Sequence, residues 1–152
     1  MFLFSCYSGL RFSDLMNLKP EHIQHTGEGL EIALHKMVKI PQPVFIPLHM
    51  VFKGKGESIL KKYLSDKTEY IFPRITGQKA NEYLKTVARD ASISKRVTWH
   101  TARHTFGSQL AARYNDPYLI MQLMGHKEIK TSMIYIHSCQ EIIKNKLKKV
   151  NW

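Results

Sequence analysis

Residues 29–48, GLEIALHKMVKIPQPVFIPL, change the hydrophobic period of the chain, and this change constrains the fold more than any other feature. Ile32 and Leu34 alternate with their neighbours, and so do Val44, Ile46 and Leu48. A period of two residues places such side chains on one face of a β-strand. The two alternating runs are separated by KIPQP, which favours a turn. The stretch therefore predicts a β-hairpin.

The remaining sequence has helical patterns with recognisable ends. Asp116 can cap a helix that begins at Pro117, and Gly125 can end it. Gly9 closes an apolar helix in FLFSCYSG, and Pro20 stops a second one. The predicted helices lie in FLFSCYSG, RFSDLMNLKPEHI, SILKKYLS, HTARHTFGSQLAARY and NDPYLIMQLMGH, with one or two more in EIKTSMIYIHSCQEIIKNKLKKV. The segment YIFPRITGQKANEYLKTVARDA predicts a loop followed by a helix. The predicted fold class is mostly α with a small antiparallel β-sheet (α+β).

The chain carries a large positive charge that is spread along its length. Its 152 residues suit one domain, and the formal net charge is +11. Such a surface suits nucleic acid, which is bound by phosphate neutralisation, although a basic surface can also serve only solubility. No apolar run reaches about 18 residues, so no transmembrane helix is predicted. Cys6 and Cys139 give neither a disulfide framework nor metal-ligand spacing, which favours a reducing, cytosolic setting.

Three clusters of polar residues could carry chemistry. Arg11 follows a glycine turn near a helix start, where it could meet an anion or simply pair with Asp14. His100 and Arg103 in WHTARH share a helix face and could clamp an anion. His100 and His104 have a spacing that permits zinc. Against a metal, Thr101 stands where a metalloprotease needs glutamate, and Arg103 would repel a cation.

The third cluster is MGHKEIKTSMIY, in which His126 precedes Tyr135 by nine residues. At about 100° per residue, Ile129, Met133 and Ile136 form one apolar stripe, and Tyr135 points away from it. This spacing weighs against core packing for Tyr135, although a surface tyrosine can also merely stack or donate a hydrogen bond. His137 has no predicted chemical role. Lys39 lies near the hairpin tip, where Lys36 is a competitor for any role.

Taken in chain order, these motifs resemble those of the tyrosine site-specific recombinases, the phage-integrase-like enzymes of bacteria and their mobile elements. The resemblance spans about residues 8–137, and three residues depart from the common pattern: Ser8, Ile40 and Met124. The matching site residues are Arg11 in SGLRFSDL, Lys39 before VFIPL, His100 and Arg103 in WHTARHTF, His126 in MGH, and Tyr135 in TSMIYIH.

The resemblance implies a DNA breaking and rejoining catalytic core acting on double-stranded DNA. Tyr135 would attack a phosphodiester to give a 3′-phosphotyrosyl link and a free 5′-hydroxyl, without a nucleotide cofactor or a metal. Arg11, Arg103 and His126 would bind the phosphate. His100 would accept or relay the tyrosine proton, and Lys39 would protonate the leaving 5′-oxygen.

The resemblance also implies a domain organisation. Residues 1–152 would be a C-terminal catalytic domain that lacks its first helix and the N-terminal core-binding clamp domain. The protein would be cytoplasmic, associated with the bacterial nucleoid, and would assemble as a tetrameric synapse on DNA. The basic tail QEIIKNKLKKVNW would dock on a neighbouring protomer or remain solvated.

Three other functions compete with recombination. The first is a DNA-binding fragment that is inactive on its own, and the second is strand relaxation like that of a type IB topoisomerase. A metal-dependent nuclease is the third. The sequence does not identify the DNA site, or whether the reaction integrates, resolves or inverts DNA.

Overall fold

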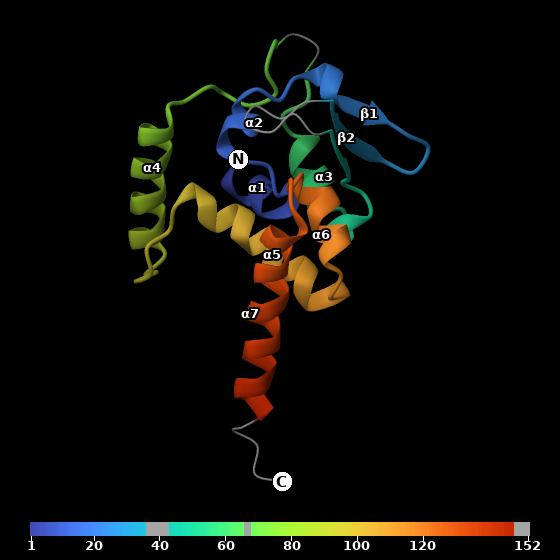
Figure 1. Ribbon diagram of the computed structural model, residues 1–152. Coiled ribbons are helices and arrows are strands. Elements are labelled where there is room, and N and C mark those ends of the chain that lie inside the picture. Colours follow the sequence, from blue (N-terminus) through green and yellow to red (C-terminus); the bar gives the residue numbers. More distant parts are fainter. Residues whose placement is uncertain (36–42, 66–67, 148–152) are drawn as a thin grey trace.

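The structure is a computed structural model that describes residues 1–35, 43–65 and 68–147 of the chain (Figure 1). Within these residues the chain is mostly helical, with one small sheet, as the sequence predicts. The α-helices are α1 (Phe2–Ser8), α2 (Phe12–Met16), α3 (Lys55–Leu60), α4 (Gly77–Asp90), α5 (Trp99–Tyr114), α6 (Pro117–Met124) and α7 (Ile129–Leu147). Two 3₁₀ turns are η1 (Pro20–His22) and η2 (Val51–Gly54).

The sheet contains the predicted hairpin. Strand β2 (Leu30–Leu34) pairs antiparallel with β3 (Val44–Pro47), with Ile32 opposite Ile46. Alternate side chains of both strands are buried and enter the core, as the period of two requires. The sequence missed β1 (Ile23–His25), which pairs with the other edge of β2. Only Ile23 of this strand is buried, so three residues gave no alternating pattern to detect.

Local sequence signals set the ends of several helices as predicted. Asp116 caps α6, because its carboxylate accepts hydrogen bonds from the backbone N–H groups of Tyr118 and Leu119. Gly125 then ends α6 in the left-handed conformation, at a φ of 60°. Gly9 ends α1 in the same way, with a φ of 69°. Both glycines are therefore followed by loops whose direction is fixed.

Two predicted helices are shorter or displaced. Helix α2 ends at Met16, before Pro20, and there the Asn17 side chain donates to the Ser13 carbonyl in competition with the backbone. Helix α3 starts before the predicted segment and ends at Leu60, where the chain tightens into 3₁₀-type bonds such as that from Tyr63 N–H to the Leu60 carbonyl.

Helix α5 is the centre of the fold. It packs against α1, α6 and α7, while α6 also contacts β3 (Figure 1). Phe106 and Leu110 of α5 are buried in a core that includes Phe4 of α1 and Ile46 of β3. Helix α7 begins against α5 and α6, and its C-terminal half projects away from the body of the molecule (Figure 1). Among the described residues, no helix is long and apolar enough to cross a membrane.

Candidate functional site

Tyr135 of α7 is buried, which corrects the interpretation that it points away from the packed face. Its side chain is 7% exposed and belongs to the hydrophobic core, whereas Thr131, expected on the same side, is exposed. The sequence argument assigned one narrow apolar stripe to α7. The buried part of the helix surface is wider because α7 packs against two helices, α5 and α6. Tyr135 lies toward one edge of that wider arc, with Ser132 and Ile136 also buried.

Two neighbours fix the plane of the Tyr135 ring. On one side lies Gly107 of α5, where a Cβ atom would come within 2.7 Å of the ring. The His126 imidazole lies parallel to the phenol, with ring centroids 6.1 Å apart. Only glycine permits the helix backbone to approach the tyrosine this closely. The phenol is therefore held in one defined position between α5 and the loop after α6.

The hydroxyl of Tyr135 meets a histidine that the sequence suggests only as a zinc ligand. Tyr135 Oη lies 3.2 Å from Nδ1 of His104, on α5. His100, the expected proton acceptor, is exposed one turn earlier on the same helix. One signal in the sequence could have indicated this contact: Gly107 interrupts a helical pattern three residues after His104, and an isolated glycine in a helix often marks close packing.

Arg103 connects the two loops that carry the other site residues. Its side chain is 7% exposed, and its guanidinium donates to the carbonyls of Gly9 and Met124, each at 2.5 Å. Gly9 precedes Arg11 by two residues, and Met124 precedes His126 by two. Burial lowers the pKa of Arg103 to about 10, with a further contribution from the Arg11 charge. The guanidinium therefore stays charged at neutral pH, and three of its five N–H groups are not used by these carbonyls.

Arg11 is the N-terminal flanking residue of α2 and is close enough to Arg103 for its positive charge to lower the pKa of the Arg103 guanidinium. It forms the ion pair that was the alternative interpretation from sequence, with Nη1 3.9 Å from Oδ2 of Asp14. Asp14 is buried. The pairing does not remove Arg11 from the site, because a buried carboxylate can also orient the guanidinium for an incoming anion.

His126 is 5% exposed, and its ring is held by the same helix that carries Tyr135. Nδ1 of His126 lies 2.8 Å from Oγ of the buried Ser132, three residues before Tyr135. Burial lowers the pKa of His126 to about 4, and the charges of Arg103 and Arg11 act in the same direction. The imidazole is therefore neutral near pH 7, and Nε2 is the ring nitrogen left for a substrate.

The lowered pKa of His126 predicts an acid-sensitive stability. An unfolded histidine binds a proton below about pH 6.5, whereas folded His126 does so only near pH 4. The unfolded chain therefore binds more protons in this window, so the contribution is complete above about pH 6.5 and is lost as pH falls toward 4. We expect a loss of about 2 kcal/mol in the free energy of unfolding between pH 7 and pH 5.

Urea unfolding at both pH values measures this loss. In His126→Asn the loss in free energy of unfolding between pH 7 and pH 5 should be smaller by about 2 kcal/mol. His137→Asn, at an exposed position on α7, should show the same pH dependence as the native chain. An unchanged pH dependence in His126→Asn would contradict the assignment.

The same positive charges act on Tyr135. Burial raises the pKa of its phenol above the ordinary value, while Arg103 and then Arg11 act in the opposite direction. The hydroxyl therefore remains protonated at neutral pH. A negatively charged group placed among these residues would meet two guanidinium groups, a neutral imidazole and a phenol that carries a proton.

The remaining site predictions are not tested by the geometry. Lys39, and its competitor Lys36, lie outside the described residues. Among the residues that are described, no group of three or more His, Cys, Asp or Glu side chains could hold a metal ion. The structure thus brings together Arg11, Arg103, His126 and Tyr135 and adds His104 to them.

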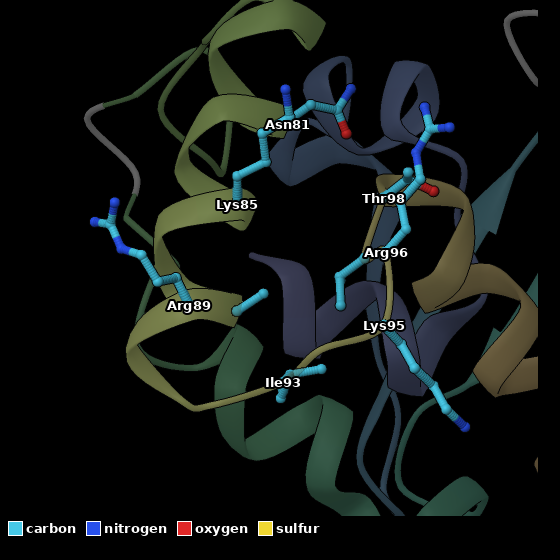
Figure 2. A pocket seen from close by; sticks show the side chains of 9 residues that line it. Asn81, Lys85, Arg89, Ile93, Lys95, Arg96 and Thr98 are labelled. Carbon is cyan, nitrogen blue, oxygen red and sulfur yellow. The ribbon is translucent and has the colours of Figure 1, made fainter.

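A basic cleft of about 470 Å³ lies between α4 and the segment that leads into α5. Figure 2 shows the side chains of Lys85, Arg89, Lys95 and Arg96 around it, together with Thr98. Four cationic side chains on two adjacent segments make a surface that attracts a polyanion. Because Thr98 immediately precedes α5, this surface adjoins the helix that carries Arg103 and His104.

Three comparisons relate the chain to known proteins. The sequence profile of the phage integrase family matches residues 1–141. A tyrosine recombinase of Thermosipho africanus is 30% identical over 142 residues, which cover 86% of this chain and 46% of that protein. The tyrosine recombinase XerA of Pyrococcus furiosus is 28% identical and covers 95% of this chain and 51% of that protein. The chain thus spans about half the length of the curated relatives it matches.

The fold is similar to that of solved recombinase structures. A crystal structure of XerA recombinase superposes with a TM-score of 0.72 at 21% identity, covering 97% of this chain and 56% of the other. The XerH site-specific recombinase, bound to a palindromic difH substrate in a post-cleavage complex, gives a TM-score of 0.72 at 19% identity, with 97% and 44% covered.

Proposed function

Because the chain belongs to the phage integrase family, we propose that it is the catalytic part of a site-specific DNA recombinase that acts through Tyr135. The observation that carries this proposal is the position of Tyr135 beside His126 and within the field of Arg103 and Arg11. The relatives are recombinases of about twice this length, so the proposal concerns the catalytic chemistry of residues 1–152. The expectation of a separate DNA-clamping domain remains a prediction.

The proposed reaction exchanges one phosphate ester for another. Tyr135 Oη attacks the phosphorus, the bond to the 5′-oxygen breaks, and a 3′-phosphotyrosyl ester forms with a free 5′-hydroxyl. A 5′-hydroxyl of a partner strand then attacks the ester and releases the tyrosine. Because the ester retains the energy of the broken bond, the cycle requires no nucleotide cofactor.

The surrounding residues suit the charges of this reaction. Negative charge grows on the non-bridging oxygens in the transition state, and forked guanidinium donors such as Arg11 and Arg103 can stabilise it. Neutral His126 can donate a further hydrogen bond through Nε2.

Double-stranded DNA would be the substrate. The basic cleft between α4 and the segment that leads into α5 would contact its phosphate backbone (Figure 2). Complete strand exchange joins two duplexes, and four copies on two paired sites would supply four tyrosines.

Covalent capture from a random-sequence library tests this proposal and selects the DNA site in the same experiment. The protein is incubated with library duplexes that carry a nick, so that the short strand released by cleavage diffuses away and rejoining is prevented. Protein-linked DNA that survives boiling in detergent is then sequenced. We expect capture of a defined sequence through a 3′ link. Recombination between two copies of that sequence, rather than relaxation of a supercoiled plasmid, distinguishes a recombinase from a topoisomerase.

The proposed general acid can be tested with a substrate that does not need one. A bridging 5′-sulfur leaves without protonation, so Lys39→Ala should recover on this substrate most of the roughly 100-fold or greater loss it shows on the oxygen substrate. Arg103→Ala should remain impaired on both substrates. If Lys36→Ala is the variant that recovers cleavage, the general acid is Lys36. If neither variant recovers, neither lysine is the general acid.

A further inference from the structure

The hydrogen bond between α5 and α7 points to a residue role that the family motifs did not assign. Nδ1 of His104 lies 3.2 Å from Oη of Tyr135, and the two rings are tilted, with centroids 5.8 Å apart. Gly107, one turn after His104, brings the α5 backbone against the Tyr135 ring. The same helix therefore seats the phenol ring and presents an imidazole to its hydroxyl.

We propose that His104, rather than His100, accepts the phenolic proton of Tyr135 during DNA cleavage. The proposal rests on the proposed function, because it deepens the role of the same site. Both histidines are exposed, and it is His104 that makes a direct contact with the hydroxyl, while His100 lies one turn earlier on α5. A proton acceptor must lie within hydrogen-bond distance of the proton it removes.

The third histidine of the site is a poor proton acceptor. Nδ1 of His126 is occupied by Ser132, and its ring lies parallel to the phenol with the ring centroids 6.1 Å apart. The same burial that lowers the pKa of His126 to about 4 also makes it a weak base. His104 is exposed, so an imidazolium formed by protonation at Nδ1 can lose its other proton, on Nε2, to water.

The step balances without another reactant. Neutral His104 carries its proton on Nε2, and Nδ1 takes the Tyr135 proton as the bond between Oη and phosphorus forms. The bond from phosphorus to the 5′-oxygen breaks, and that oxygen takes a proton from the general acid. The phosphate supplies the negative charge that compensates the positive charge of the resulting imidazolium. In the rejoining step the proton returns from His104 to the tyrosine.

The test compares single-turnover rates of covalent capture on the selected nicked DNA. If the native protein captures no DNA, the proposed function fails and the variants are not needed. If it does, His104→Ala should cleave roughly 100-fold or more slowly, while DNA binding is unchanged. His137→Ala, at an exposed histidine two residues after Tyr135, is the matched control and should cleave as the native protein does.

Two further variants separate proton transfer from positioning. His104→Asn keeps a polar atom near the place of Nδ1 but cannot accept the proton, so it should cleave as slowly as His104→Ala. Placing 3,5-difluorotyrosine at position 135 makes the nucleophile more acidic, so it should recover most of the loss in His104→Ala but little of any loss in His100→Ala.

Three results would overturn the proposal. One is native-like cleavage by His104→Ala. The second is full activity in His104→Asn, which would leave His104 only a hydrogen-bonding role. The third is recovery by difluorotyrosine in His100→Ala instead of His104→Ala, which would make His100 the acceptor.

Discussion

Tyr135→Phe is expected to abolish covalent capture of DNA while leaving non-covalent binding nearly unchanged. The substitution removes only the hydroxyl, so the ring keeps its place against Gly107 and parallel to His126. One hydrogen bond to His104 is lost, which is worth about 0.5–1.5 kcal/mol of stability. Without the nucleophilic oxygen, no ester to phosphorus can form, and the loss of capture should be complete rather than partial.

Denaturing gels of protein incubated with the nicked DNA measure capture, and a mobility shift on the intact duplex measures binding. Tyr118→Phe is the matched control, since Tyr118 is exposed on α6. It should capture DNA as the native protein does. Capture by Tyr135→Phe at the native yield would exclude Tyr135 as the nucleophile.

Arg103→Lys is expected to impair both folding stability and cleavage. Lysine keeps the positive charge but cannot reach the carbonyls of Gly9 and Met124 together as the guanidinium does. An unsatisfied buried carbonyl costs about 1–3 kcal/mol, which corresponds to a melting temperature lower by roughly 2–12 °C in a domain of this size. The loops that carry Arg11 and His126 would no longer be joined by hydrogen bonds to one side chain.

The expected loss in cleavage rate is roughly 100- to 1000-fold, as for other single electrostatic donors to a transition state. Thermal unfolding and single-turnover capture measure the two effects. Arg113→Lys, at an exposed position of the same helix, controls for the exchange of arginine for lysine. If Arg103→Lys melts and cleaves as the native protein does, the hydrogen bonds of Arg103 to the Gly9 and Met124 carbonyls contribute neither to stability nor to cleavage.

Much of the fold could be predicted because its signals are local. The Asp116 and Gly125 signals defined α6, and the change of hydrophobic period defined the β2–β3 hairpin. Strand β1 was missed because one buried residue, Ile23, carries no period. The error for Tyr135 had a different cause: the angular argument treated α7 as having one neighbour, whereas two helices cover it.

The sequence predicted which residues form most of the candidate site, but not the contacts among them. Arg11, Arg103, His126 and Tyr135 are brought together, although they come from four separate segments. Contacts of Arg103 with backbone carbonyls depend on the tertiary fold and have no sequence pattern. The contact of His104 with Tyr135 likewise joins residues 31 positions apart.

Identification of the residue bonded to DNA tests the central claim most directly. Captured protein is digested with nuclease and trypsin, and the peptide that retains a nucleotide is sequenced by mass spectrometry. Cleavage after Lys130 and Lys144 gives TSMIYIHSCQEIIK, in which Tyr135 is the only tyrosine. We expect a nucleotide joined through its 3′-phosphate to Tyr135. An adduct on any other residue, or a link through a 5′-phosphate, would contradict the proposed chemistry.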